Sequence, residues 1–146
     1  MKIIALIPAR YAATRFPYKL LQPLGNKTVI RHTYDNTVAT GIFDDVWVVT
    51  DSPLIYDEIT SHGGKARMSI REHESGSDRI AEAIADMEVD VVINVQGDEP
   101  FIDPHQIDLL CGTLDPTTEL ATLIQKIKTL DQILSLGEAK VVINTS

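Results

Sequence analysis

The chain has few of the features that mark secreted or membrane proteins. It contains one cysteine, Cys111, among 146 residues, so no internal disulfide can form and a reducing compartment such as the cytoplasm is expected. No apolar run approaches the roughly 18 residues that a membrane-spanning helix needs, and the opening MKIIALIPAR is shorter than a signal peptide. We therefore expect a cytoplasmic protein with no membrane partner.

The chain also lacks the glycine-rich loops of two common nucleotide-binding folds. Neither G-x-G-x-x-G nor G-x-x-x-x-G-K-[ST] occurs, which argues against a dinucleotide-binding fold and a P-loop fold. The four histidines have no metal-ligand spacing with one another or with Cys111, so zinc is not expected.

Positive charge is scarce overall but concentrated at one end of the chain. The net charge is −8, from 13 basic and 21 acidic residues, which argues against nucleic acid as a partner because a phosphate backbone would be repelled. Residues 1–34 hold no acid and carry +6, so the other 112 residues carry −14. The six basic residues are Lys2, Arg10, Arg15, Lys19, Lys27 and Arg31. This distribution predicts a local anion site on an acidic protein.

Hydrophobic patterning predicts one α/β domain with alternating strands and helices. Short apolar runs predict strands at 2–7 (ended by Pro8), 45–49, 65–68, 89–95, 120–127 and 140–143. Helical patterns occupy 28–40, 53–62, 77–87, 104–114 and, more briefly, 130–136. This alternation predicts right-handed βαβ units and a three-layer sandwich with a mostly parallel sheet. We expect residues 1–146 to form one nucleotide-binding domain.

Three segments that follow predicted strands carry residues suited to chemistry, because ligands of open α/β sheets bind beyond the carboxyl ends of the strands. The first segment carries Arg10, Arg15 and Lys19 and no glycine. Arginine forks clamp phosphate oxygens with two bonds, and lysine adds a mobile point charge. The segment therefore predicts a phosphate site built from side chains, the alternative being charges that are simply solvated.

The second segment is Gln96-Gly97-Asp98-Glu99-Pro100, which directly follows an apolar strand. Asp98 is placed to hold a hard cation such as Mg²⁺ beside a phosphate, because Mg²⁺ takes one or two carboxylates together with substrate phosphates. Gly97 allows another group to come close. The alternative is a turn in which Asp98 and Glu99 only cap the backbone or face solvent.

The third segment runs from Arg71 to Arg79 and leads into a predicted helix. Backbone amides at a helix N-terminus accept polar or anionic groups, and Gly76 permits a close approach. Taken alone, the segment is equally consistent with an ordinary helix cap.

The three segments resemble one enzyme family. The strings IPARYAATRFPYK (7–19), HESGSDRIAEA (73–83) and INVQGDEPFI (93–102) are similar to those of the 3-deoxy-manno-octulosonate cytidylyltransferases, also called CMP-KDO synthetases. The resemblance covers the whole chain and implies a nucleotide-diphospho-sugar transferase-like fold. It also implies transfer of CMP from CTP to 3-deoxy-manno-octulosonate (KDO) with Mg²⁺ and release of pyrophosphate, for lipopolysaccharide biosynthesis, by a homodimer.

The resemblance also implies roles for individual residues. The nucleotide-binding residues that it implies are Ala9, Arg10, Arg15, Lys19, Arg71, Ser75, Gly76, Gln96 and Gly97. Arg10, Arg15 and Lys19 are expected to grip the triphosphate, and the segment from Arg71 to Gly76 to form part of the cytidine pocket. Asp98 is the expected metal ligand, and Arg10, Lys19 and Asp98 are the expected catalytic residues.

The sequence departs from the family pattern in two places. Ala13 stands where the family usually has serine, and Tyr18-Lys19-Leu20 stands where it usually has Gly-Lys-Pro. Tyrosine adopts positive φ less readily than glycine, which affects the aim of Lys19.

Family members continue well past residue 146, and their later part supplies the sugar-acid pocket, a further metal-binding aspartate and most of the dimer contact. We therefore expect this chain to be the N-terminal, nucleotide-binding portion, which binds CTP but transfers CMP slowly or not at all. Two alternatives are kept: a synthetase that activates sialic acid, and a catalytically silent nucleotide-binding module.

Overall fold

The structure is a computed structural model that describes residues 2–10, 19–70, 76–115, 117 and 118. The chain divides into two compact units, Met1–Pro104 and His105–Ser146. The elements of the first unit are β1 (Ile3–Ala9), the 3-10 helix η1 (Lys19–Leu21), β2 (Pro23–Leu24), β3 (Lys27–Thr28), α1 (Val29–Ala39), β4 (Asp45–Thr50), α2 (Pro53–Thr60), β5 (Ala66–Met68), α3 (Gly76–Ile84) and β6 (Val91–Asn94). Helix α4 (Pro104–Gly112) follows.

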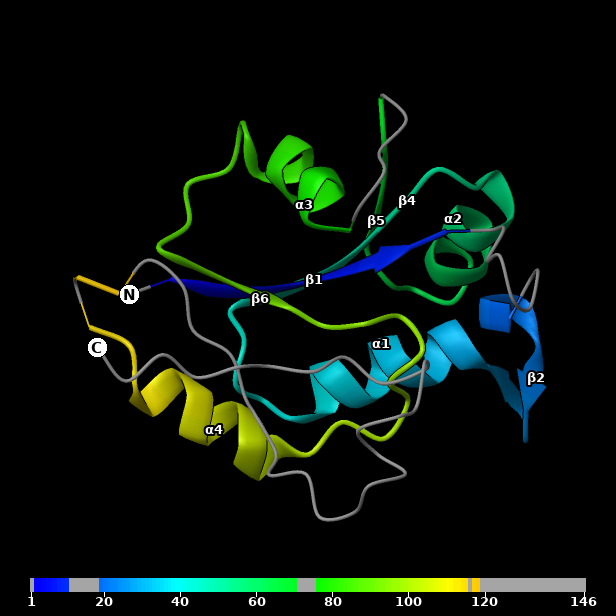
Figure 1. Cartoon of the computed structure of the whole chain (residues 1–146). Coiled ribbons are helices and arrows are strands. Elements are labelled where there is room, and N and C mark those ends of the chain that lie inside the picture. The colour runs from blue at the N-terminus through cyan, green and yellow to red at the C-terminus, as the bar shows by residue number, and fades with distance from the viewer. Residues whose placement is uncertain (1, 11–18, 71–75, 116, 119–146) are drawn as a thin grey trace, which may run out of the picture. The chain divides into compact units, whose positions relative to one another are not determined.

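The first unit is built on a parallel sheet with the strand order β5-β4-β1-β6. Helices α1 and α2 lie on one face of this sheet and α3 lies on the other (Figure 1). Strands β2 and β3 form a separate antiparallel hairpin beside the start of α1. The predicted three-layer α/β arrangement is therefore confirmed.

The core is centred on β1, which is buried on both faces. Ile4, Ala5, Leu6 and Ile7 are each at most 2% exposed. Ile4 and Leu6 pack with Val49 of β4 and with Ile80 and Ala83 of α3. Because successive side chains of a strand point to opposite faces, Ala5 and Ile7 face the α1 side. This two-sided burial explains why the strand reads as a continuous apolar run.

The prediction that Pro8 ends the first strand is wrong, because β1 continues to Ala9. Pro8 lacks a backbone N–H, so it is tolerated only where no ladder hydrogen bond is needed. Leu6 O points toward β6 and accepts a hydrogen bond from Val95 N. The backbone nitrogen of Pro8, two residues later, points toward the same side. The pairing of β1 with β6 ends at Leu6, so Pro8 removes no hydrogen bond from the ladder.

Helix α1 begins and ends within one residue of the predicted range, because Thr28 caps its N-terminus through the bond from Arg31 N. The other helices end two or three residues early. Their last predicted residues instead form single turns with bonds to the third preceding residue, as in Met87 N to Ile84 O. The β2–β3 hairpin was not predicted. The predicted elements at 120–127, 130–136 and 140–143 lie outside the described residues.

In the described part of the chain, no helix is both long and apolar enough to cross a membrane.

Candidate functional site

The carboxyl ends of β1, β4 and β6 meet at one edge of the sheet, because these strands are parallel neighbours. Arg10 follows β1, Asp51 follows β4, and the segment from Gln96 to Asp98 follows β6 shortly after its last residue. The structure therefore brings the first and second predicted segments together at the edge where α/β proteins bind ligands.

Lys19 and Asp98 lie 79 positions apart in the sequence and form an ion pair. Lys19 Nζ donates to Asp98 Oδ2 at 3.0 Å, and each side chain is 46% exposed. An ion pair this exposed contributes at most about 1 kcal/mol to stability, so both charges remain available to a ligand. Two residues predicted separately, one for phosphate and one for metal, are thus side by side.

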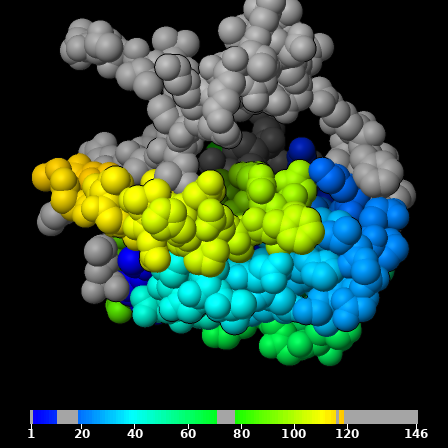
Figure 2. Space-filling model, turned by 90° about the horizontal axis from the view of Figure 1, so that it is seen from below, coloured from blue at the N-terminus to red at the C-terminus, as the bar shows by residue number. Residues whose placement is uncertain are grey.

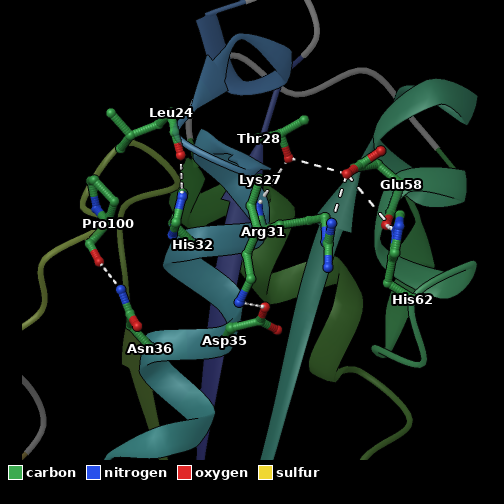
Figure 3. A network of polar contacts seen from close by, with 10 residues as sticks. All are labelled: Leu24, Lys27, Thr28, Arg31, His32, Asp35, Asn36, Glu58, His62 and Pro100. Carbon is green, nitrogen blue, oxygen red and sulfur yellow. Dashed lines mark hydrogen bonds and ion pairs between the residues drawn. The ribbon is translucent and has the colours of Figure 1, made fainter.

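The loop that carries Asp98 is held by β1 and α1. Val95 N donates to Leu6 O at 3.0 Å, which extends the β1 contact beyond the end of β6. On the other side, the buried Thr33 hydroxyl donates to Gly97 O at 2.7 Å. Asn36 Nδ2 donates to Pro100 O, as Figure 3 shows. Asp98 is therefore presented from a fixed backbone rather than from a free loop.

Gly97 is buried, and the close approach predicted for it is made by the chain itself. A Cβ atom at this position would lie 3.2 Å from both Pro8 O and Leu20 Cδ1. Glycine at this position therefore allows the β6 loop to pack against the end of β1 and against η1, which carries Lys19. That packing sets the distance between Lys19 and Asp98.

Arg10 and Gln96 are exposed at the same edge, whereas Ala9 is buried and can offer only its backbone. No hydrogen bond or ion pair of Arg10 is found within the part of the chain that the structure describes. Gln96 Nε2 donates weakly to Asn94 Oδ1 at 3.4 Å. Both side chains are thus placed for a ligand. Gly76 is the first residue of α3, while Arg15, Arg71 and Ser75 lie outside the described residues.

Part of the basic N-terminal segment is used for structure rather than for ligand. Lys27 pairs with Asp35 at 2.7 Å, and Arg31 lies 3.7 Å from Glu58, which joins α1 to α2 (Figure 3). Figure 2 shows residues 19–40 as a continuous strip on one face, with the segment after β6 lying against it. Of the predicted anion-binding charges in the described residues, Arg10 and Lys19 are the ones at the strand ends.

Sequence reasoning missed Arg79, which stands in the quoted string HESGSDRIAEA but was assigned no role. Its side chain is buried, and its guanidinium contacts Ser69 and Asp51 at the ends of β5 and β4. Its position next to Ile80 in the apolar pattern of the helix was the available signal.

A protein-family model covers almost the whole chain. The model described as "Cytidylyltransferase" matches residues 4–146 of the chain. The chain belongs to this cytidylyltransferase family.

Relatives in the family carry a more specific name. A 3-deoxy-manno-octulosonate cytidylyltransferase of Flavobacterium johnsoniae is 57% identical over 100% of the chain and 62% of its own length. One of Christiangramia forsetii is 48% identical over 97% of the chain and 58% of its own length. The chain thus spans about 60% of the length of these relatives.

Solved structures agree with the cytidylyltransferase fold. A CMP:2-keto-3-deoxy-manno-octonic acid synthetase complexed with CTP superposes with a TM-score of 0.73 and 39% identity, covering 77% of this chain and 46% of that one. A cytidylyltransferase from Leptospira borgpetersenii superposes with a TM-score of 0.66 and 24% identity, covering 78% of this chain and 49% of that one. The second likeness concerns the fold alone.

Proposed function

We propose that the chain binds CTP at the carboxyl edge of its sheet and serves the transfer of CMP to KDO with release of pyrophosphate. The observation that carries the proposal is the Lys19–Asp98 pair, which lies at the strand-end edge where the exposed Arg10 also emerges. The identity of the two substrates, CTP and KDO, is supported by relatives named 3-deoxy-manno-octulosonate cytidylyltransferase and by a similar synthetase structure that contains CTP.

Arg10 and Lys19 are the groups that bind the triphosphate in this proposal. The hydroxyl of KDO attacks the α-phosphorus and releases its proton to solvent, the bond from that phosphorus to the bridging oxygen breaks, and the electron pair leaves with pyrophosphate. Negative charge grows on the departing pyrophosphate, and cations placed beforehand stabilise it. Such a reaction depends on in-line positioning and charge more than on an enzyme nucleophile. Sequence-predicted Arg15 would add a third cation.

The residues present fit a magnesium ion. Within the described ranges no three histidine, cysteine or acidic side chains gather, but Mg²⁺ bound with a nucleotide needs only one or two protein carboxylates. Asp98 is half exposed and would hold the ion, which would supply positive charge beside the phosphates. Lys19 would then exchange its carboxylate partner for phosphate oxygens, so the pair keeps both groups in place before the ligand arrives.

The cytidine pocket is proposed from Gln96 together with Arg71, Ser75 and Gly76. Gln96 is exposed at the edge, and Gly76 begins α3, which follows directly on the proposed pocket segment. The homodimer implied by the resemblance remains a prediction.

Calorimetric titration with CTP and Mg²⁺, followed by a pyrophosphate-release assay, tests the proposal. We expect CTP to bind. Because the chain spans only about 60% of the length of its relatives, we expect pyrophosphate release to be slow, and to be stimulated by KDO but not by sialic acid. Stimulation by sialic acid alone would favour the related synthetase, and CTP binding without release under any sugar acid would favour the silent module. A chain that does not bind CTP would contradict the proposal.

A further inference from the structure

Arg79 is the one charged side chain that is almost fully buried in the described part of the chain, with 1% exposure. It lies near the start of α3. Its Nη1 donates to Ser69 Oγ at 2.5 Å, and its Nη2 lies 3.6 Å from Asp51 Oδ2. Burying a guanidinium is costly unless it is paired and hydrogen-bonded, so these two contacts hold Arg79 where it is.

The two partners of Arg79 lie just beyond the ends of adjacent strands. Asp51 follows β4 and Ser69 follows β5, and Ser69 N donates to Thr50 O at 2.8 Å. Trp47 and Val49 pack on the α3 side of the sheet, so the alternation of β4 directs Asp51 to the same side. Arg79 therefore joins the carboxyl ends of β4 and β5 to α3.

The strand register also places Asp51 beside Arg10. Ala9 of β1 pairs with Thr50 of β4 at the end of the register, and the next residues, just beyond the two strands, are Arg10 and Asp51. Residues at matching positions of parallel neighbours point to the same face. The alternation of the two strands, continued by one residue, directs the Asp51 carboxylate and the Arg10 guanidinium to the same face of the sheet. The carboxylate nevertheless contacts Arg79, and Arg10 has no ion pair among the described residues.

We propose that Arg79 is a positioning residue that keeps the Asp51 carboxylate on itself and so leaves Arg10 available for the phosphates of the nucleotide. This rests on the proposed function, because the ligand assigned to Arg10 is the triphosphate of CTP. Arg79 does not touch the nucleotide and acts through Asp51. Without Arg79, Asp51 would pair with Arg10, and that pair would have to break before phosphate could bind.

Calorimetric titration of CTP with Mg²⁺ into four proteins tests this inference: the wild-type chain, Arg79→Met, Asp51→Asn and the double variant. We expect Arg79→Met to weaken CTP binding roughly fivefold, which corresponds to an ion pair of about 1 kcal/mol at a half-exposed site. The double variant should regain wild-type affinity, because no carboxylate remains to compete for Arg10. Asp51→Asn alone should keep wild-type affinity, although its thermal stability falls.

Arg67→Met is the matched control for a purely structural role. Arg67 also joins β5 to α3, through Ala83 O at 2.9 Å, and to the turn after α3, through Asp86 Oδ2 at 2.6 Å, but no contact of Arg67 with Asp51 is found. We expect this variant to lower the melting temperature and to leave CTP affinity unchanged.

Three outcomes would overturn the inference. The first is that Arg79→Met binds CTP as tightly as the wild type. The second is that the double variant does not regain wild-type CTP affinity, which is the result expected if Arg79 has a purely structural role. If Arg79→Met does not fold, Arg79→Gln removes the charge while keeping a donor for Ser69, and the same loss and recovery are expected of it. A wild-type chain that does not bind CTP would overturn the proposed function and this inference together.

Discussion

At the scale of single residues, the same charge type serves different ends at different places. Arg10 is exposed beyond the central strand and has no ion pair in the described ranges, whereas Lys65 pairs with Asp45 at 2.7 Å at the opposite, amino end of the strands. Position relative to the sheet edge, rather than charge itself, therefore separates the cation that we propose to bind ligand from the structural one.

Arg10→Ala is expected to weaken CTP binding by about 10- to 100-fold, the range for losing hydrogen bonds worth about 1.5–3 kcal/mol between charged groups. Lys65→Ala, which removes an equal charge from the far end of the strands, should leave the affinity unchanged. Isothermal titration calorimetry of both variants gives the comparison. Equal losses in the two variants would show that the effect comes from net charge and not from the site.

Asp98→Asn is expected to remove most of the Mg²⁺ dependence of CTP binding, because it keeps the shape of the side chain and removes the charge that favours the cation. Glu99→Gln changes the neighbouring exposed acid in the same loop and is the control, with Mg²⁺ dependence intact. CTP titrations at several Mg²⁺ concentrations measure both. A large drop in melting temperature with unchanged Mg²⁺ dependence would mean that Asp98 is a structural turn residue.

Sequence reasoning placed Lys19 and Asp98 in separate phosphate and metal roles, and the structure adds that they are neighbours. A strand-end position can be predicted from the apolar runs, but a side-chain pairing across 79 residues cannot. Arg79 was missed for a related reason. A basic residue in an amphipathic helix is normally solvated. The position of Arg79 next to Ile80 was the available signal, but the contacts with two strand ends are visible in the tertiary structure alone.

At the scale of elements, α1 does more than cover the sheet. Its buried face presents Thr33 to the backbone of Gly97, and Asn36 reaches Pro100, so one helix holds both ends of the loop that carries Asp98. The helical pattern at 28–40 predicted this helix to within one residue at each end. It did not predict this contact, because threonine hydroxyls in a helix usually bond within the helix itself.

Thr33→Val is expected to destabilise the fold by about 1–3 kcal/mol, because it leaves the buried Gly97 carbonyl without its hydroxyl donor. It should also weaken CTP binding by loosening the Asp98 loop. Thr37→Val is the matched control: Thr37 is equally buried, but its hydroxyl donates to Thr33 O inside the helix, at 2.6 Å. Urea unfolding and CTP titration compare the two variants. Equal losses of stability and of CTP affinity in Thr33→Val and Thr37→Val would contradict this account.

The ion pair between Asp45 and Lys65, at the amino ends of β4 and β5, makes the stability of the fold depend on pH in the acid range. Burial pushes the pKa of Asp45 upward, but hydrogen bonds from Lys65 and Trp47 outweigh burial, and the pKa lies below its usual value. The folded state therefore binds this proton less readily than the unfolded state. The stabilisation is complete above the usual carboxyl pKa of about 4 and is lost as pH falls through the lowered value.

Asp45→Asn should accordingly be less stable than the wild type at neutral pH, and the difference should shrink on acidification. Lys65→Met removes the partner and should produce the same convergence. Thermal melts recorded across the acid range measure it. A difference that stays constant with pH would show that Asp45 stabilises the fold through its shape and not through its charge.

At the scale of the whole molecule, the arrangement of charge matters more than the net value of −8. The +6 stretch predicts an anion site near the N-terminus, yet Lys27 and Arg31 of that stretch are engaged with Asp35 and Glu58. Composition counts charges but not their partners. The fold class followed from alternation and apolar runs, whereas the hairpin β2–β3 escaped prediction because two-residue strands carry too little pattern.

The central claim is that CTP binds at the carboxyl edge of the parallel sheet, and amide chemical-shift mapping by NMR tests it most directly. On addition of CTP with Mg²⁺, we expect the largest shifts at Arg10, at Lys19 to Leu21 and at Gln96 to Asp98. The amides of Asp44, Lys65 and Asp90, near the amino ends of the strands, should not move. Shifts confined to that opposite end, or no shifts at all, would contradict the account.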